Sequence, residues 1–289
     1  MELPLTILIT GCSSGIGYEL LKLFNHHPYR VVATALPESV EPLNADPVSQ
    51  SERIWVRQLD VADFEAASAI VRETKEKWGP IDVLINNAGI SYRSVIEDMT
   101  PEDEQRQIAV NYLGAMHLIR ECLPEMRRRK AGRIINVSSV GGMMAMPTMA
   151  SYSASKFALE GASESLWYEM KPWNIKVTLV RPGFINSIAF RKVLYSSKRN
   201  GGSSSASYNS HYHCMSQFVE KFMTKSKSTS ASVAKRIYKA AQMDNPPLRM
   251  AGTRDAWLFY FLRRLLPRAL YHKFLYMSLP GRKEWGRKS

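Results

Sequence analysis

The sequence predicts an α/β fold in which a doubly wound parallel sheet is covered by helices on both faces. Short apolar runs alternate along the chain with longer segments of helical periodicity. The runs are almost wholly apolar, which is typical of parallel strands buried on both faces. The first run ends in a glycine-rich turn that leads directly into a helix. The 289 residues, 45% of them hydrophobic, suffice for one such sheet with an added cap.

Each element is predicted from its own apolar pattern. The expected strands cover residues 5–10, 30–36, 54–59, 83–85, 133–139, 175–180 and 248–251. The expected helices cover residues 18–24, 63–78, 101–128, 152–170 and 232–242, with Asn111 interrupting the third. Residues 37–53 are polar and contain several prolines, so we expect an irregular segment on the surface there.

A glycine-rich turn joins the first strand to the first helix. It reads Thr10-Gly11-Cys12-Ser13-Ser14-Gly15-Ile16-Gly17. Glycines permit the tight turn and the close approach of a pyrophosphate, and the helix start offers free N–H groups. An ordinary glycine turn would have a similar composition, but this spacing between a strand and a helix favours a dinucleotide site.

The end of the second strand bears on which dinucleotide binds. An acidic residue there would bind a ribose 2′-hydroxyl and repel a 2′-phosphate. This chain has Ala35 and Leu36 instead, and neither Ser13 nor Ser14 is basic. The missing acid slightly favours NADP(H) over NAD(H).

A tyrosine and a lysine four residues apart, Tyr152 and Lys156, would lie on one helix face. The ammonium would lower the phenol pKa, so that Tyr152 could exchange a proton with a substrate oxygen. Ser139 follows an apolar run, which places its hydroxyl at the carboxyl end of a strand, where such sheets build their sites. A chance pair of this spacing is common in a chain with 13 tyrosines, so the pair alone is weak support.

Several polar residues follow other strands or interrupt a helix. Asp60 ends the third strand and could meet an adenine edge, and Asn86-Asn87-Ala88-Gly89 ends the fourth. Paired asparagines are usually turn formers, but their amides can also hold neighbouring strands and a cofactor. Asn111, among apolar neighbours, is predicted to bond within the core or to hold a water.

A flexible segment follows the sixth strand, where a substrate lid would sit. Residues 196–209 are rich in serine and glycine, and we expect a lid over about 188–228. His211-Tyr212-His213 lacks a third ligand nearby, so no metal site is predicted. The small-residue face formed by Phe157, Ala158, Gly161, Ala162, Ser165 and Leu166 favours packing against a second subunit, as a homodimer or homotetramer.

The net charge of +13 is concentrated at the C-terminus. Residues 245–289 hold ten Lys/Arg and two Asp/Glu, which is +8 of the total. No nucleic-acid-binding module is recognisable there, so we expect no nucleic acid partner.

Three scattered cysteines, Cys12, Cys122 and Cys214, suit a reducing compartment and argue against a disulfide framework. Met1 to Ile9 is predicted to be the first strand and not a signal peptide, so we expect a cytoplasmic protein.

Residues Trp257 to Met277 are predicted to lie on the cytoplasmic face of a membrane. An apolar stripe recurs at helical spacing, and Pro267 should divide it into two short amphipathic helices. Charged residues interrupt the run too often for a spanning helix, which needs about twenty apolar residues. The tail could instead fold back as a lid or pack against a partner subunit. The stripe consists of Leu258, Phe261, Leu262, Leu265 and Ala269.

Together these motifs resemble the short-chain dehydrogenase/reductase family over residues 3–252. The glycine turn, Asp60, the Asn86–Gly89 run, Asn111, Ser139, Tyr152 with Lys156, and Pro182-Gly183 occur in that family's order and spacing. The branch of 17β-hydroxysteroid and retinol dehydrogenases is the most similar. Ala35-Leu36 departs from it, since arginine is frequent there, and so does the serine- and glycine-rich lid. The branch likeness rests on Val140-Gly141-Gly142, Phe157-Ala158-Leu159-Glu160-Gly161 and Leu248-Arg249.

The resemblance implies a Rossmann-type catalytic domain over residues 1–252, with 253–289 as the basic amphipathic tail. It implies hydride transfer between NAD(P) and a lipophilic alcohol or ketone such as a steroid or retinoid. Tyr152 would be the acid/base, Lys156 would lower its pKa and hold the nicotinamide ribose, Ser139 would orient the substrate oxygen, and Asn111 would hold a water. The implied cofactor residues are Gly11, Ser13, Ser14, Gly15, Ile16, Gly17, Asp60, Val61, Asn87, Ala88, Gly89, Tyr152, Lys156, Pro182, Gly183, Ile185 and Ser187.

Two other functions fit the same motifs. A β-ketoacyl-thioester reductase would share every catalytic residue, and a panel of retinoid, steroid and acyl-thioester substrates would separate it from the lipophilic-alcohol enzyme. A cofactor-sensing binding protein would use the fold without turnover, but Ser139, Tyr152 and Lys156 are all present, which argues against it.

Overall fold

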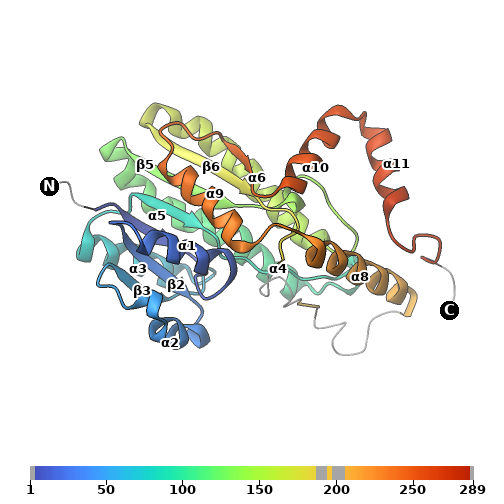
Figure 1. Cartoon of the computed structure of the whole chain (residues 1–289), viewed down its shortest axis with the longest axis horizontal. Coiled ribbons are helices and arrows are strands. Elements are labelled where there is room, and N and C mark those ends of the chain that lie inside the picture. Colours follow the sequence, from blue (N-terminus) through green and yellow to red (C-terminus); the bar gives the residue numbers. More distant parts are fainter. Residues whose placement is uncertain (1–3, 187–193, 197–205, 287–289) are drawn as a thin grey trace.

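A computed structural model of the chain describes residues 4–186, 194–196 and 206–286. In this part of the chain a seven-stranded sheet forms the centre (Figure 1), with strand order β3-β2-β1-β4-β5-β6-β7. Every neighbouring pair is parallel. The strands are β1 (Thr6–Ile9), β2 (Arg30–Ala35), β3 (Ile54–Gln58), β4 (Val83–Asn86), β5 (Gly132–Val137), β6 (Ile175–Arg181) and β7 (Arg249–Ala251).

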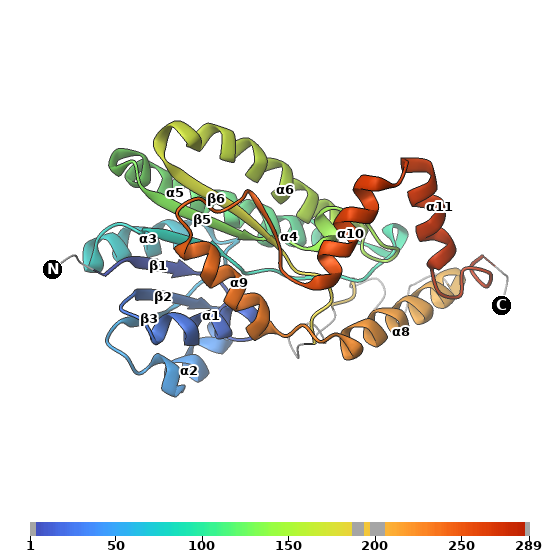
Figure 2. The same ribbon diagram turned by 45° about the horizontal axis from the view of Figure 1, so that its top comes forward.

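Helices cover both faces of the sheet, as Figures 1 and 2 show. On one face α1 (Gly15–Asn25) packs beside α9 (Ser230–Gln242). On the other face lie α3 (Phe64–Trp78), α5 (Gly114–Arg129) and α6 (Ala150–Met170). The predicted three-layer α/β/α fold with a doubly wound parallel sheet is therefore confirmed.

Each strand contributes to both cores because successive side chains point to opposite faces. In β1, Ile7 and Ile9 join the core under α1 and α9, and Leu8 joins the core under α3, α5 and α6. This explains why the strands are apolar throughout and show no alternation.

The strand order reverses at β1, whose neighbours are β2 and β4. The carboxyl ends of these strands form the crevice where ligands of such sheets bind.

The segment 37–53 differs from the expected irregular excursion. It forms a helix, α2 (Pro37–Ala45), and a short 3₁₀ turn, η1 (Pro47–Ser49). Pro37 occupies the first helical turn, where its fixed φ is favourable and its missing N–H is not needed. Polarity made the segment look like a loop, whereas Leu43 is its one buried residue and anchors the helix to the core.

The predicted helix over 101–128 is interrupted where expected. Helix α4 (Pro101–Ile108) passes into a π-helical turn, η3 (Ala109–Leu113), and then into α5. Wide turns of this kind are rare and concentrate at functional sites. Asn111 lies in the middle of this one.

The chain after β6 leads to the C-terminal helices. Helix α8 (Asn209–Lys225) follows a 3₁₀ turn, η7 (Ala206–Tyr208), while most of the predicted serine- and glycine-rich insert lies outside the described residues. The tail forms α10 (Arg254–Leu265) and α11 (Arg268–Ser278), separated at Pro267 as predicted. Both views show α10, α11 and α8 extending from the same end of the sheet.

One residue, Leu166, does not lie on an exposed face of α6, although we predicted that it would pack against a second subunit. Leu166 is buried in the core of its own chain, whereas Phe157 and Gly161 on the same helix are exposed. Helix α6 turns Leu166 toward the sheet, because the predicted set of residues spans more than one side of the helix. The guanidinium of Arg263, from α10, lies 5.6 Å from the ring centroid of Phe157, so the tail reaches one end of this face.

Candidate active site

The glycine turn after β1 begins the candidate site. A Cβ atom on Gly17 would overlap the carbonyl oxygen of Gly11, so only glycine lets α1 start this close to the turn. Asn87, after β4, holds the turn in place. Its amide nitrogen donates to the carbonyl oxygens of Thr10 (2.9 Å) and Gly11 (3.1 Å). Asn86 donates to Asn136 Oδ1 at 2.8 Å and so links β4 to β5. The asparagine run therefore holds neighbouring strands, as predicted, and it also holds the turn.

The start of α1 suits an anionic group. The side chain of Ser14, the N-cap residue, makes no capping hydrogen bond, and the first turn carries no acidic residue. Ser13 and Ser14 are exposed beside these helix-terminal N–H groups. Uncapped N–H groups at the positive end of a helix dipole match a pyrophosphate. The remaining turn residues, Gly15, Ile16 and Gly17, form the first helical turn.

Asp60 lies at the next loop along this edge, after β3. Its carboxylate is paired with the guanidinium of Arg106, from α4, at 2.7 and 3.1 Å. It also accepts a hydrogen bond from the N–H of Ala62 (3.0 Å). Burial opposes ionisation, but Arg106 and the Ala62 N–H outweigh it and lower the pKa of Asp60. Val61 is buried behind it in the core.

Ser139 and Tyr152 meet above the end of β5. The Tyr152 phenol is hydrogen-bonded to the Ser139 side chain, whose oxygen also accepts from the N–H of Gly141 at 3.0 Å. A Cβ atom on Gly141 would lie 2.8 Å from Tyr152 Cε1, so this glycine makes room for the ring. Ser139, Gly141 and Tyr152 thus fix one another.

The Tyr152 pKa is raised in this structure, contrary to the expected lowering. Burial of the phenol is the largest cause, and it outweighs the hydrogen bond from Ser139 and the positive charge of Arg93. The Lys156 ammonium instead donates to the carbonyl oxygen of Val137 at 3.0 Å. Burial lowers the pKa of Lys156 to about 8, although the Glu160 carboxylate opposes the change. At neutral pH the pair is therefore a neutral phenol beside an ammonium.

Asn111 uses its side-chain amide to join three segments. Its oxygen accepts from the N–H of Ile90 (2.8 Å), and its nitrogen donates to the Ile90 carbonyl (2.9 Å) and to Ser155 Oγ (3.0 Å). Ser155 in turn donates to the Tyr152 carbonyl at 2.7 Å. Of the two predicted roles, the structure gives Asn111 the core hydrogen-bonding one, and water holding stays a prediction. Ala88 and Gly89 lie between this residue and the glycine turn.

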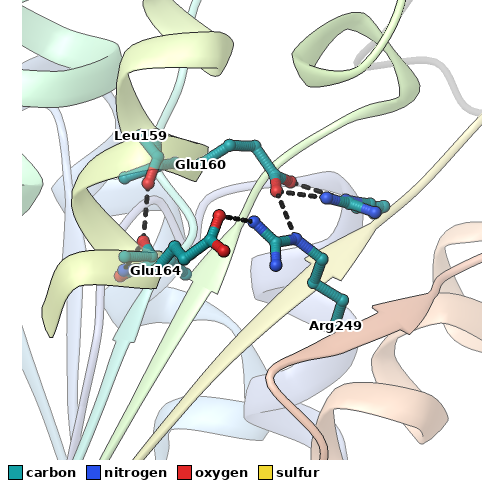
Figure 3. Close-up of polar contacts among 7 residues, drawn as sticks. Leu159, Glu160, Glu164 and Arg249 are labelled. Carbon is teal, nitrogen blue, oxygen red and sulfur yellow. Dashed lines mark hydrogen bonds and ion pairs between the residues drawn. The ribbon is translucent and has the colours of Figure 1, made fainter. Parts of the chain in front are cut away.

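An ion network lies directly behind Lys156. Glu160, one turn further along α6, binds Arg181 at the end of β6 through both nitrogens of a guanidinium fork and binds Arg249 of β7 at 3.2 Å. Arg249 also bonds to Glu164 at 2.7 Å. Figure 3 shows Glu160 and Glu164 pointing from α6 toward Arg249. The network ties the helix that carries Tyr152 and Lys156 to the last two strands.

The Pro182-Gly183 turn closes the site at the end of β6. The Pro182 carbonyl accepts from the N–H of Val140, and the N–H of Gly183 donates to Thr253 Oγ1, both at 2.8 Å. Ile185 is buried nearby in the core. Ser187, the remaining predicted cofactor residue, lies outside the described residues.

Comparison with known proteins decides the family. The short chain dehydrogenase family profile matches residues 5–197. The chain belongs to the short-chain dehydrogenase family. It is thus an oxidoreductase of a family that uses nicotinamide cofactors. The family resemblance inferred from the motifs is confirmed.

One curated relative and two solved structures illustrate the similarity. The 3-ketodihydrosphingosine reductase of Bacteroides thetaiotaomicron is 36% identical over 184 residues, which are 64% of this chain and 65% of that protein. This chain thus spans just under two thirds of that relative. A short-chain dehydrogenase from Streptomyces avermitilis superposes with a TM-score of 0.80, at 29% identity over 96% of this chain and 98% of that one. ElxO with NADP bound gives a TM-score of 0.69, at 29% identity over 86% of this chain and 98% of that one.

An apolar cluster next to the Pro182-Gly183 turn contains residues that the motifs did not reveal. Phe184, Val219 and Met223 form a buried apolar cluster with Met146, Phe218 and Phe259. These come from the turn after β6, from α8 and α10, and from the loop before α6. Arg93, whose charge acts on Tyr152, was also missed, because a single arginine in a loop carries no spacing signal. A cavity of about 590 Å³ lies beside this cluster, but residues 225–228 and 252–255 line it and the Ser139–Tyr152 pair does not.

Other sequence features take no part in the site. Among the described residues no group of three His, Cys, Asp or Glu is placed to hold a metal. His211 stacks on Trp285, with ring centroids 4.5 Å apart, and Tyr212 is buried. In the same described ranges, no helix is both long and apolar enough to cross a bilayer.

Proposed function

We propose that the chain transfers a hydride between NAD(P) and the alcohol or ketone of a lipophilic substrate, with Tyr152 as the acid/base. The observation that carries the proposal is the contact between Ser139 and Tyr152 with Lys156 one helical turn away, on the edge where the glycine turn lies. In the reducing direction the neutral phenol of Tyr152 supplies a proton to the carbonyl oxygen, while Ser139 orients that oxygen.

The residues around the glycine turn would hold the cofactor. The start of α1 would take the pyrophosphate, Asp60 and Val61 would line the adenine, and Lys156 would hold the nicotinamide ribose. The bound nicotinamide supplies or accepts the hydride. Asn87, Ala88 and Gly89 on one side and Pro182, Gly183 and Ile185 on the other would close around it.

A modest preference for NADP(H) is part of this proposal. Ala35 is buried at the end of β2, and Leu36 is exposed at the N-cap of α2, so no carboxylate at these positions would repel a 2′-phosphate. The similarity to NADP-bound ElxO supports the same choice.

A lipophilic substrate is supported by the apolar cluster around Phe184. Methionine side chains adapt to irregular apolar shapes, and Met146 and Met223 both belong to this cluster. The similar Bacteroides enzyme is named for a ketone carried by a lipid. Steroid, retinoid and β-ketoacyl-thioester ketones stay open as substrate classes.

The test is the substitution Tyr152→Phe, which removes one hydroxyl and keeps the ring. Turnover of ketones from a library of steroids, retinoids, long-chain ketones and acyl thioesters is followed by NADPH absorbance. The variant should lose about 100-fold or more in kcat while it binds NADPH with unchanged affinity. Tyr168→Phe, on an exposed side chain of the same helix, is the matched control. Activity of Tyr152→Phe within a few-fold of the parent would exclude this role.

The tail would bring the enzyme to a membrane surface on the cytoplasmic side. Trp257, Leu258, Leu265, Leu270 and Phe274 are all more than half exposed, and arginines lie among them. Apolar side chains beside cations are typical of helices that lie in the interface of anionic bilayers.

Helix α6, with Phe157 and Gly161 exposed, would meet a second subunit in a homodimer or homotetramer.

The membrane proposal is tested by co-sedimentation with vesicles of phosphatidylcholine and phosphatidylserine at low and high salt. A truncation after Asn245 would also remove β7, so the double variant Leu265→Glu/Phe274→Glu is preferable. It should abolish sedimentation, and Ile96→Glu, at a position that is 77% exposed and outside the tail segment, should not. Equal sedimentation of all three proteins, or of none, would show that the tail does not bind the membrane.

A further inference from the structure

Arg93 lies in the loop between the Asn86–Gly89 run and α4, and the described part of the lid fixes its backbone. Its N–H donates to the carbonyl oxygen of Leu194 at 2.8 Å. The N–H of Ser196 donates to Ser94 Oγ at 3.0 Å, and that of Val95 donates to the phenol of Tyr212, on α8, at 3.1 Å. The backbone around Arg93 is therefore held against residues 194–196 and against α8.

The guanidinium of Arg93 is half-buried and has a single weak acceptor among the described residues. That acceptor is the sulfur of Met223, on α8, at 3.9 Å from Nη2. Burial lowers the pKa of Arg93, while the phenols of Tyr195 and Tyr152 oppose this change.

A guanidinium with five donors in a rigid fork is costly to remove from water without an anionic partner. The positive charge of Arg93 acts on the Tyr152 phenol, and its guanidinium contacts the sulfur of Met223, part of the apolar cluster with Phe184. Tyr152 is the proposed reacting group, and the cluster is the apolar surface proposed to bind the substrate. The missing partner should therefore arrive with the substrate.

We propose that Arg93 binds a carboxylate on the substrate and so holds the reacting carbon against Tyr152. This inference rests on the proposed function and narrows its substrate class to lipophilic oxo or hydroxy acids. A carboxylate matches one guanidinium in charge and in fork geometry. A phosphate dianion would call for further cations, and the proposed function already assigns the Lys156 ammonium to the nicotinamide ribose.

The experiment compares acids with their neutral esters. The probes are straight-chain fatty acids with the ketone at carbon 3, 4, 5 or 6, together with their methyl esters, assayed with NADPH. Arg93→Met should raise the KM for the preferred oxo acid by about 10- to 100-fold and leave the KM for its ester unchanged. Arg93→Lys should recover part of the loss, and Arg57→Met, in an exposed ion pair on β3, should change neither.

A second readout keeps the inference testable without turnover. Binding of decanoate and of 1-decanol, neither of which is reduced, is measured by calorimetry on the protein saturated with NADP⁺. Loss of decanoate affinity in Arg93→Met, with 1-decanol affinity kept, supports the carboxylate site. Equal affinity of parent and variant for decanoate overturns it, whether or not any ketone is reduced.

The same variants separate this inference from an effect of Arg93 on Tyr152. If Arg93→Met lowers the kcat of acid and ester alike and shifts the pH profile of the ester, the arginine acts on the phenol and the carboxylate site is wrong. In that case the proposed oxidoreductase function stands, because the parent still reduces both substrates. Failure of the parent to reduce any ketone would instead contradict the proposed function, and decanoate binding would still decide the role of Arg93.

Discussion

Glu160→Gln should destabilise the protein severely, because glutamine has nearly the same shape as glutamate but does not carry its negative charge. The Glu160 side chain is 6% exposed and that of Arg181 is 10% exposed, so the substitution would leave a buried cation without its counterion. Removing one partner of a buried pair costs about 3 kcal/mol or more. With a urea m-value of about 3 kcal/mol/M for a chain of this size, the unfolding midpoint should fall by about 1 M.

Glu164→Gln provides the matched control on the same helix. The Glu164 side chain is 43% exposed and makes one bond, to Arg249. Exposed pairs of this kind contribute about 1 kcal/mol at most, so the midpoint should move by less than about 0.3 M. Urea unfolding followed by tryptophan fluorescence measures both variants. Equal shifts of the midpoint for the two substitutions would refute the conclusion that the buried Glu160 carboxylate supplies most of the stabilisation by this network.

Glu160→Gln should also change the pH dependence of activity. The Glu160 carboxylate raises the pKa of Lys156 against the larger effect of burial, so its loss should bring that pKa further below 8. The alkaline decline of kcat/KM would then begin at lower pH than in the parent. Glu164→Gln should leave the profile in place.

Three further predictions concern the site. In the parent, Lys156 loses its proton as the pH rises through about 8, so kcat/KM for NADPH should be constant near pH 7 and decline above 8; a flat profile to pH 10 would contradict this. Leu36→Asp should shift the ratio of kcat/KM for NADPH over NADH toward NADH by about tenfold, since a carboxylate repels the 2′-phosphate, and an unchanged ratio would refute the placement of the ribose. Gly141→Ala should lower kcat about tenfold or more with unchanged NADPH affinity, because its Cβ would lie 2.8 Å from the Tyr152 ring, and an unchanged kcat would contradict this reasoning.

The sequence was most informative where a residue type is required by backbone geometry at a strand end. The glycine turn, the asparagine run and Ser139 all follow parallel strands, so the fold alone brings them to one edge. Their positions could be predicted because apolar runs mark the strands. Helix α2 was missed because its polar composition and prolines gave no apolar period, although Pro37 suits a helix start.

Long-range contacts and local electrostatics could not be predicted from spacing. The partners of Glu160 lie 21 and 89 residues further along the chain, and nothing in their local sequence links them. The raised pKa of Tyr152 follows from burial, which a Tyr-x-x-x-Lys pattern does not report. Arg93 likewise became a candidate only through its contact with Met223 and its effect on the Tyr152 phenol, both of which come from residues far along the chain.

The late position of β7 in the chain should affect how the protein folds during synthesis. This three-residue strand completes the sheet edge beside β6 and carries Arg249, which reaches back to Glu160 on α6. While the ribosome is still making residues 182–248, the nascent chain has β6 with an open edge and Glu160 with only Arg181. Such unpaired edges are prone to association with other chains. Expression should therefore depend on the rate of translation over this stretch, and a chain stalled before Arg249 would be a substrate for chaperones.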